Sequence, residues 1–118
     1  MSHYSDFIRT LYQIVDNKDA RALAELLHPD VMFTFSNAET VSGVNAVTAI
    51  NAQFFASIQT MNHTFAGMYE VGDTLVCEGQ VDYIRLDGSA YDAKFATILT
   101  LKDGLIYQYK IFADVSGL

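Results

Sequence analysis

Three turn signals divide the second half of the chain into strands, and they constrain its fold more than any other feature. Each signal places glycine beside aspartate, a pair that tolerates the positive φ angles of tight hairpin turns; they are Gly72-Asp73, Asp87-Gly88 and Asp103-Gly104. The segments between them are rich in β-branched and aromatic residues, which is typical of strands. We therefore predict four strands that follow one another as antiparallel hairpins, over residues 63–71, 74–86, 89–101 and 105–114.

The first half of the chain has helical patterning. Apolar side chains in residues 3–16 recur at helical spacing, and Asp19 can cap a second short helix. That helix is predicted to end at His28-Pro29, because the residue before proline disfavours α geometry. A short strand is expected over residues 31–35, with 40–42 pairing back, and a third helix after Gly43. Helices followed by a run of strands indicate an α+β fold.

Length and composition favour one domain, residues 1–118, with ample apolar material for a core. The chain is 51% hydrophobic, and its single cysteine, Cys77, excludes an internal disulfide. Residues 1–6 are polar and do not look like a signal peptide. No apolar run approaches the roughly 20 residues needed to cross a bilayer. We expect a cytoplasmic protein that does not bind membranes.

The net charge of −7 argues against a nucleic acid partner. Binding to phosphates depends on clustered lysine and arginine, whereas the seven basic residues here are scattered. The three histidines are also dispersed and lack the spacing of metal ligands, so no metal and no cofactor is expected. Cys77 is expected to be a buried small hydrophobe rather than a nucleophile.

The order of these elements, together with several short motifs, resembles the nuclear transport factor 2-like superfamily in its SnoaL-like and ketosteroid-isomerase-like branch. The residues that carry the resemblance are 15–19 (VDNKD), 28–31 (HPDV), Ser42-Gly43, 103–106 (DGLI) and 112–114 (FAD). The resemblance implies three N-terminal helices packed on a curved antiparallel sheet as a cone, a cystatin-like α+β roll with an internal pocket. It also implies a homodimer, but no single function, because this scaffold hosts isomerases, dehydratases, cyclases, epoxide hydrolases and binders.

The steroid isomerase pattern of that branch fails when it is carried over position by position. The general-base aspartate of that family should fall where this chain has Phe35-Ser36. The protonated aspartate that donates to the oxyanion maps onto Thr97, and the tyrosine beside it maps near Leu11, one residue from Tyr12. Without those acids the steroid isomerase mechanism is not supported.

Strand register gives a hypothesis for the site. If each turn has two residues, His63 lies opposite Asp82, followed on neighbouring strands by Ala93 and Asp114. By the resemblance this face is concave. A histidine across from an aspartate has a fixed tautomer and a free nitrogen that can act as a base. We therefore predict His63, Asp82 and Asp114 as catalytic residues acting on a hydrophobic small molecule.

The substrate-binding residues predicted beside them are aromatic or polar and lie on that face or on the inner sides of the helices and first strand: Tyr12, Phe35, Phe54, Phe65, Glu78, Gln80, Tyr91, Phe95, Thr97, Lys110 and Phe112. Three of these residues, Glu78, Thr97 and Lys110, are predicted to lie side by side in a second row across the strands. The opposite face, with Val81, Tyr83, Tyr107, Tyr109 and Ile111, is predicted to form the homodimer contact, since monomers rarely expose a large apolar patch.

Two alternatives to the catalytic hypothesis remain open. A register error of one residue would leave Asp82, Glu78 and Lys110 on a solvated face and turn Val81 and Tyr109 toward the helices. The charged residues could also form a structural ion-pair network.

The function is open between two classes. One is a cofactor-independent acid/base lyase, isomerase or cyclase, and the other is a non-catalytic ligand-binding or association module. A cavity below roughly 300 Å³ would favour the second class.

Overall fold

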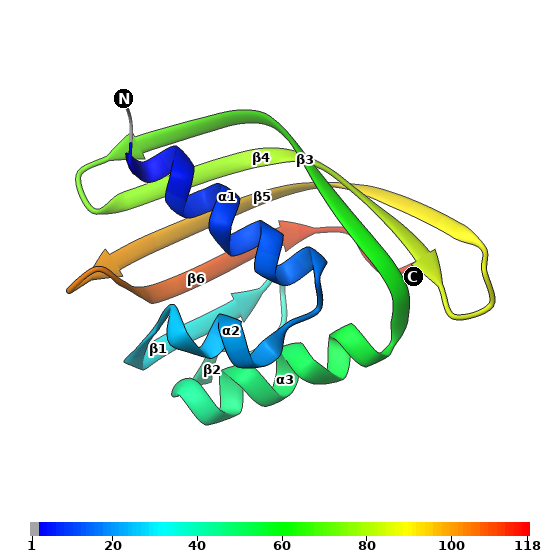
Figure 1. Ribbon diagram of the computed structural model, residues 1–118, viewed down its shortest axis with the longest axis horizontal. Coiled ribbons are helices and arrows are strands. Elements are labelled where there is room, and N and C mark those ends of the chain that lie inside the picture. The colour runs from blue at the N-terminus through cyan, green and yellow to red at the C-terminus, as the bar shows by residue number, and fades with distance from the viewer. Residues whose placement is uncertain (1–2) are drawn as a thin grey trace.

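The computed structural model describes residues 3–118 (Figure 1). These residues form helices and strands with the following bounds: α1 His3–Asp16, α2 Ala20–Glu25, β1 Leu27–Phe35, β2 Val41–Ser42, α3 Val44–Ala56, β3 Ile58–Val71, β4 Thr74–Arg85, β5 Ala90–Lys102 and β6 Leu105–Ala113. All the predicted helices and strands are present. The second helix is shorter than predicted, because β1 already begins at Leu27 and takes in His28 and Pro29.

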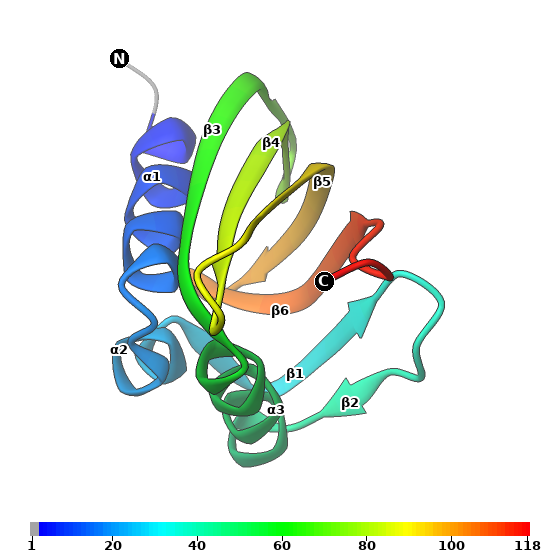
Figure 2. The same cartoon turned by 90° about the vertical axis from the view of Figure 1, so that its right-hand side faces the viewer.

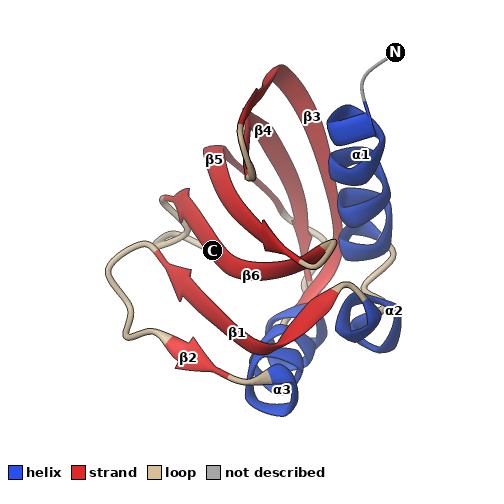
Figure 3. Cartoon of the chain, turned by 90° about the vertical axis from the view of Figure 1, so that its left-hand side faces the viewer, coloured by secondary structure: helices blue, strands red, loops and turns tan. Residues whose placement is uncertain are grey.

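The strands form one six-stranded sheet in the order β2-β1-β6-β5-β4-β3. The sheet curls strongly, and the helices lie along its inner side (Figures 2 and 3). This confirms the predicted α+β cone, with one difference: β1 pairs with β6 in parallel, so the sheet is mixed rather than purely antiparallel. The core between the layers includes Ile8 and Leu11 of α1 and Leu99 and Ile106 of the sheet, all fully buried.

Local signals explain where the helices begin. The Asp19 side chain accepts a hydrogen bond from the backbone N–H of Ala22 at 3.0 Å and so caps α2 as predicted. Gly43 precedes α3 with a φ of +89°, a conformation that residues with a Cβ rarely adopt. The chain therefore turns sharply out of β2 and into α3 at this glycine.

Two of the three turns match their prediction, and one does not. Asp103 and Gly104 both have positive φ and join β5 to β6 as a two-residue turn between Lys102 and Leu105. At the Asp87-Gly88 signal the loop has three residues, because the backbone N–H of Arg85 donates a hydrogen bond to the backbone carbonyl of Ser89 across it. The Asp87 carboxylate accepts hydrogen bonds from the Ser89 backbone and hydroxyl, which stabilises the longer loop.

Two irregularities in the ladders displace the register further. The β3–β4 pairing follows the prediction at Gly67, which lies opposite Glu78, but it shifts by one residue between Phe65 and Gly67. The β5–β6 pairing shifts in the same way just beyond its turn. Because a slip of one residue reverses every side chain, β3 and β5 have the predicted inner face, whereas β4 and β6 are inverted.

The inversion corrects the predicted rows. His63 lies opposite Val81 rather than Asp82, and Thr97 lies between Cys77 and Ile111 rather than between Glu78 and Lys110. Asp82, Glu78 and Lys110 are exposed, while Val81 and Tyr109 are buried. The alternative of a solvated outer face is therefore confirmed for β4 and β6.

The predicted dimer face is wrong for the same reason. Val81, Tyr83 and Tyr109 are 1–4% exposed and belong to the core, and Ile111 packs against it. Tyr107 contacts His28 edge-on, with ring centroids 5.4 Å apart. These five residues do not form a surface patch that a second copy could contact.

The ladder shift beside Phe65 gives a prediction about Gly79, which pairs with Phe65. A Cβ added at Gly79 would lie 1.9 Å from the backbone carbonyl oxygen of Thr64, so the strands would have to separate. We expect Gly79→Ala to lower the free energy of unfolding, measured by urea denaturation, by about 1–3 kcal/mol. The control is Gly67→Ala, whose Cβ would meet only the end of the Tyr69 side chain, which can rotate away. Equal losses in the two variants would contradict this account.

Candidate functional site

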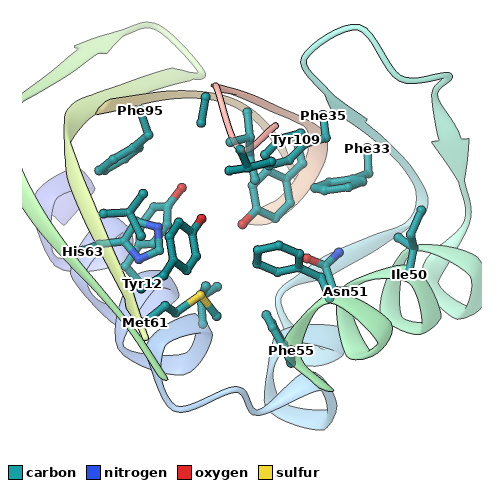
Figure 4. A pocket seen from close by; sticks show the side chains of 17 residues that line it. Tyr12, Phe33, Phe35, Ile50, Asn51, Phe55, Met61, His63, Phe95 and Tyr109 are labelled. Atoms are coloured by element: carbon teal, nitrogen blue, oxygen red, sulfur yellow. The ribbon is translucent and has the colours of Figure 1, made fainter. Parts of the chain in front are cut away.

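The inner side of the sheet and the helices enclose a cavity of about 220 Å³ (Figure 4). Its lining is almost wholly apolar or aromatic and comes from α1, α3, the strands and the segment after β6: Tyr12, Val15, Phe33, Phe35, Ile50, Asn51, Phe54, Phe55, Met61, His63, Val81, Tyr83, Phe95, Tyr109, Ile111, Ala113 and Val115. Ile50 of α3 is 39% exposed, so the cavity meets solvent beside this residue.

A histidine–aspartate pair is built into one wall. Asp16, the last residue of α1, accepts a hydrogen bond from the backbone N–H of His63 on β3 at 2.9 Å. Its other carboxylate oxygen lies 2.5 Å from His63 Nδ1. An ionised carboxylate can only accept, so Nδ1 carries a proton and Nε2 of the neutral ring is free to accept one. The His63 and Asp16 side chains are only 9% and 19% exposed.

Aromatic rings fix the orientation of His63 from both sides. The Tyr12 ring centroid lies 4.4 Å from that of the imidazole, and the Phe95 ring meets it edge-on at 4.9 Å. Tyr12 and Asp16 are one helical turn apart on α1, so one helix face supplies both the ring contact and the carboxylate. The imidazole is therefore held by a hydrogen bond and by packing, as a general base requires.

A cluster of neutral hydroxyl and thiol groups lies deeper. The Tyr12 hydroxyl is hydrogen-bonded to that of Thr97, which is fully buried. Burial raises the pKa of Tyr12 well above its ordinary value and does the same for Tyr109. Burial also raises the pKa of the Cys77 thiol to about 12. These groups keep their protons at neutral pH, so none of them is a base or a thiolate nucleophile.

The structure places five of the predicted site residues on the cavity wall: Tyr12, Phe35, Phe54, His63 and Phe95. Three others lie nearby without lining it. Thr97 bonds to Tyr12, the Phe65 ring packs edge-on against Tyr12 and Phe95, and the Tyr91 hydroxyl donates to the backbone carbonyl of Asp114 at 2.8 Å.

The remaining predicted residues lie away from the cavity, on the exposed side of the molecule: Asp82, Asp114, Glu78, Gln80, Lys110 and Phe112. Asp82 accepts a hydrogen bond from Gln80 at 2.9 Å, and Glu78 accepts one from Tyr69 at 3.1 Å. The pairing of His63 with Asp82 is therefore corrected, since Asp16 is the aspartate that contacts the imidazole.

Sequence reasoning missed several residues of the site: Asp16, Asn51, Met61, Val81, Tyr83 and Tyr109. One signal could have found Asp16. It lies four residues after Tyr12, so both side chains project from the same face of α1. Val81, Tyr83 and Tyr109 could not be placed without the correct register of β4 and β6.

Within residues 3–118, no three histidine, cysteine, aspartate or glutamate side chains gather closely enough to hold a metal ion. In the same part of the chain, no helix is long and apolar enough to cross a membrane.

The Asp16–His63 contact predicts the tautomer of the ring. In the neutral wild-type protein, ¹⁵N shifts of the imidazole should show a protonated Nδ1 and an unprotonated Nε2. Asp16→Asn should weaken that preference and lower the free energy of unfolding by about 1–3 kcal/mol, because a charged acceptor of two N–H groups is lost. Asp82→Asn is the matched control and should change neither quantity. A wild-type ring protonated on Nε2 would contradict the geometry.

The buried acids also predict how stability depends on pH. Burial raises the pKa of Cys77 from 9.0 to about 12 and that of Tyr83 from 10.0 to about 12. The unfolded chain therefore releases these protons at lower pH than the folded chain does. The free energy of unfolding should be unaffected by these groups below about pH 9 and should fall as the pH rises from 9 toward 12. Urea denaturation across this range should show a shallower fall in Tyr83→Phe, and an identical fall would contradict the assignment.

Comparisons with known proteins agree with this architecture. A sequence model described as a SnoaL-like domain matches residues 8–109. Comparison with curated protein sequences gave no match.

Three solved structures show the likeness. An NTF2-like protein of unknown function from Burkholderia pseudomallei is 20% identical, with a TM-score of 0.86 over 99% of this chain and 95% of that one. A hypothetical protein with a ketosteroid isomerase-like fold from Catenulispora acidiphila, in complex with trimethylamine, is 17% identical, with a TM-score of 0.83 over 92% and 85%. TerC, co-crystallised with polyporic acid, is 20% identical, with a TM-score of 0.83 over 98% and 95%. Identities this low show a shared fold alone.

Proposed function

The chain belongs to the SnoaL-like domain family, and from that premise we propose that it binds a small uncharged hydrophobic molecule and moves a proton on it through His63. The observation that carries the proposal is the Asp16–His63 pair on the wall of an apolar cavity. The reaction class is that of a cofactor-independent isomerase, lyase or cyclase.

The proposed chemistry follows from the two imidazole nitrogens. Nε2 removes a proton from a carbon or hydroxyl group of the bound molecule, and Asp16 stabilises the imidazolium through Nδ1–H. The same proton can then return to a different atom, or to a leaving hydroxyl group. Burial raises the pKa values of Tyr12, Tyr109 and Cys77, so these groups keep their protons. His63 is therefore the group that we propose exchanges a proton at the cavity wall.

The lining supports an uncharged ligand. Among residues 3–118, no lysine or arginine lines the cavity, and Asp16 adds a negative charge behind the wall. A carboxylate or phosphate placed here would lose its water without gaining a cation, which is strongly unfavourable. An aromatic or alicyclic molecule would instead replace water along the apolar wall.

The cavity volume favours a second candidate function. At about 220 Å³ the cavity exceeds the roughly 150 Å³ that binds benzene, so it accommodates a molecule of one or two rings. It is nevertheless below the roughly 300 Å³ of ordinary ligand sites. Small volume therefore favours a non-catalytic module that binds the same class of ligand without turnover.

A thermal-shift screen of uncharged one- and two-ring compounds tests both candidates. A ligand at 100 times its dissociation constant should stabilise the wild type by about 2.7 kcal/mol, a shift of several degrees. The hits are then assayed for turnover in the wild type and in His63→Gln. His28→Gln is the matched control, because His28 is also buried but contacts Asp103 and Tyr107 instead of the cavity.

Turnover in the wild type and in His28→Gln, lost in His63→Gln, is the expected result. Binding without turnover in the wild type would favour the non-catalytic module. If no compound of this class binds, both candidates are wrong.

Three further expectations stay predictions: a single domain, a cytoplasmic location and a homodimer. Of these, the homodimer now lacks its proposed contact face, because the residues assigned to it lie in the core.

A further inference from the structure

Asn51 is the polar side chain among the residues that α3 contributes to the cavity, beside Ile50, Phe54 and Phe55. It is 8% exposed and lies on the cavity wall across from His63 (Figure 4). Its amide Nδ2 donates a hydrogen bond to the backbone carbonyl of Val47 at 2.9 Å. A carbonyl can only accept, so this bond fixes which end of the amide is nitrogen. The amide oxygen therefore lies on the cavity side.

No residue among 3–118 donates a hydrogen bond to that oxygen. Among the same residues, Thr48 Oγ1 is the fully buried side-chain atom without a partner, so Asn51 Oδ1 is accessible from the cavity. Asparagine is a poor residue for the interior of a helix, and a leucine would pack against Phe54 and Phe55 without that cost. A hydrogen-bond donor on a ligand in the cavity would give this asparagine a role.

We infer that Asn51 determines which ligand the cavity accepts, by receiving a hydrogen bond from a hydroxyl group on an uncharged aromatic ring. This inference rests on the proposed function of the cavity and names the substrate class, a neutral hydroxyarene. The ring lies against Phe54 and Phe95, and its hydroxyl group points at Asn51 Oδ1.

The two polar atoms of the walls then have separate tasks. His63 Nε2 and Asn51 Oδ1 both accept, and they belong to opposite walls (Figure 4). A ligand anchored through its hydroxyl group at Asn51 presents its other end to His63. Asn51 is thus a positioning residue that sets which ligand atom the base reaches, and it takes no proton itself.

The test compares 2-naphthol with naphthalene, which share a ring system and differ in one hydroxyl group. Dissociation constants are measured by ligand-observed NMR for the wild type, Asn51→Leu, Asn45→Leu and His63→Gln. Asn45 is the matched control, because it is an exposed asparagine of the same helix. Asn51→Met serves as a second variant if Asn51→Leu does not fold.

The wild type and Asn45→Leu should bind 2-naphthol about tenfold or more tightly than naphthalene, since naphthalene leaves the amide oxygen without a donor. In Asn51→Leu that preference should fall to about twofold or less, with 2-naphthol bound more weakly and naphthalene more tightly.

The outcomes separate this inference from the proposed function. If the wild type binds both compounds equally, or if Asn51→Leu and Asn51→Met keep the full preference, the role of Asn51 is overturned while the cavity remains a ligand site. A preference lost only in His63→Gln would assign recognition to His63 and overturn the inference as well. If the wild type binds neither compound, the proposed function and the inference both fail.

Discussion

The two hydrogen bonds that His63 donates to Asp16 hold the site together. They join the last residue of α1 to the middle of β3, two segments 47 positions apart in the chain. One bond reaches the backbone and anchors the helix to the strand, and the other reaches the ring and sets its tautomer. The same carboxylate therefore fixes a wall of the cavity and makes His63 a candidate base, so packing and chemistry depend on one contact.

The curvature of the sheet depends on a different constraint, the irregularities in its ladders. The shift beside Phe65 accompanies a close approach of Gly79 to the Thr64 carbonyl, which only a residue without a side chain permits. Bulges bend a strand and increase its twist, so a long strand such as β3 can curl over the helices. The extra residue also reverses the faces of β3 beyond it, so His63 lies opposite Val81 and faces the cavity.

These two constraints explain how much the sequence could predict. Turns and helix caps are local, so Asp19, Gly43 and the Asp103-Gly104 hairpin were identified from neighbouring residues. The resemblance placed His63 on the concave side, and the structure agrees. Register beyond a bulge depends on contacts across the sheet, however, and a dipeptide signal does not distinguish a two-residue loop from the three-residue loop at Asp87-Gly88. For that reason the predicted place of His63 on the concave side is confirmed, its catalytic role stays a prediction, and its predicted partner Asp82 lies on the other face.

The polar groups on the inner surface are of two kinds, those that are hydrogen-bonded to one another and those that face the cavity. Tyr12 and Thr97 bond to each other in the core, and their neutral hydroxyl groups stabilise the packing of α1 on β5. His63 Nε2 and Asn51 Oδ1 are instead acceptors at the cavity, each fixed by a bond that its other polar atom makes to the protein. Neither atom is among the fully buried side-chain atoms without a partner in residues 3–118, so each is within reach of a molecule in the cavity. Their common orientation toward one apolar space is the reason why we propose a ligand that brings its own donors.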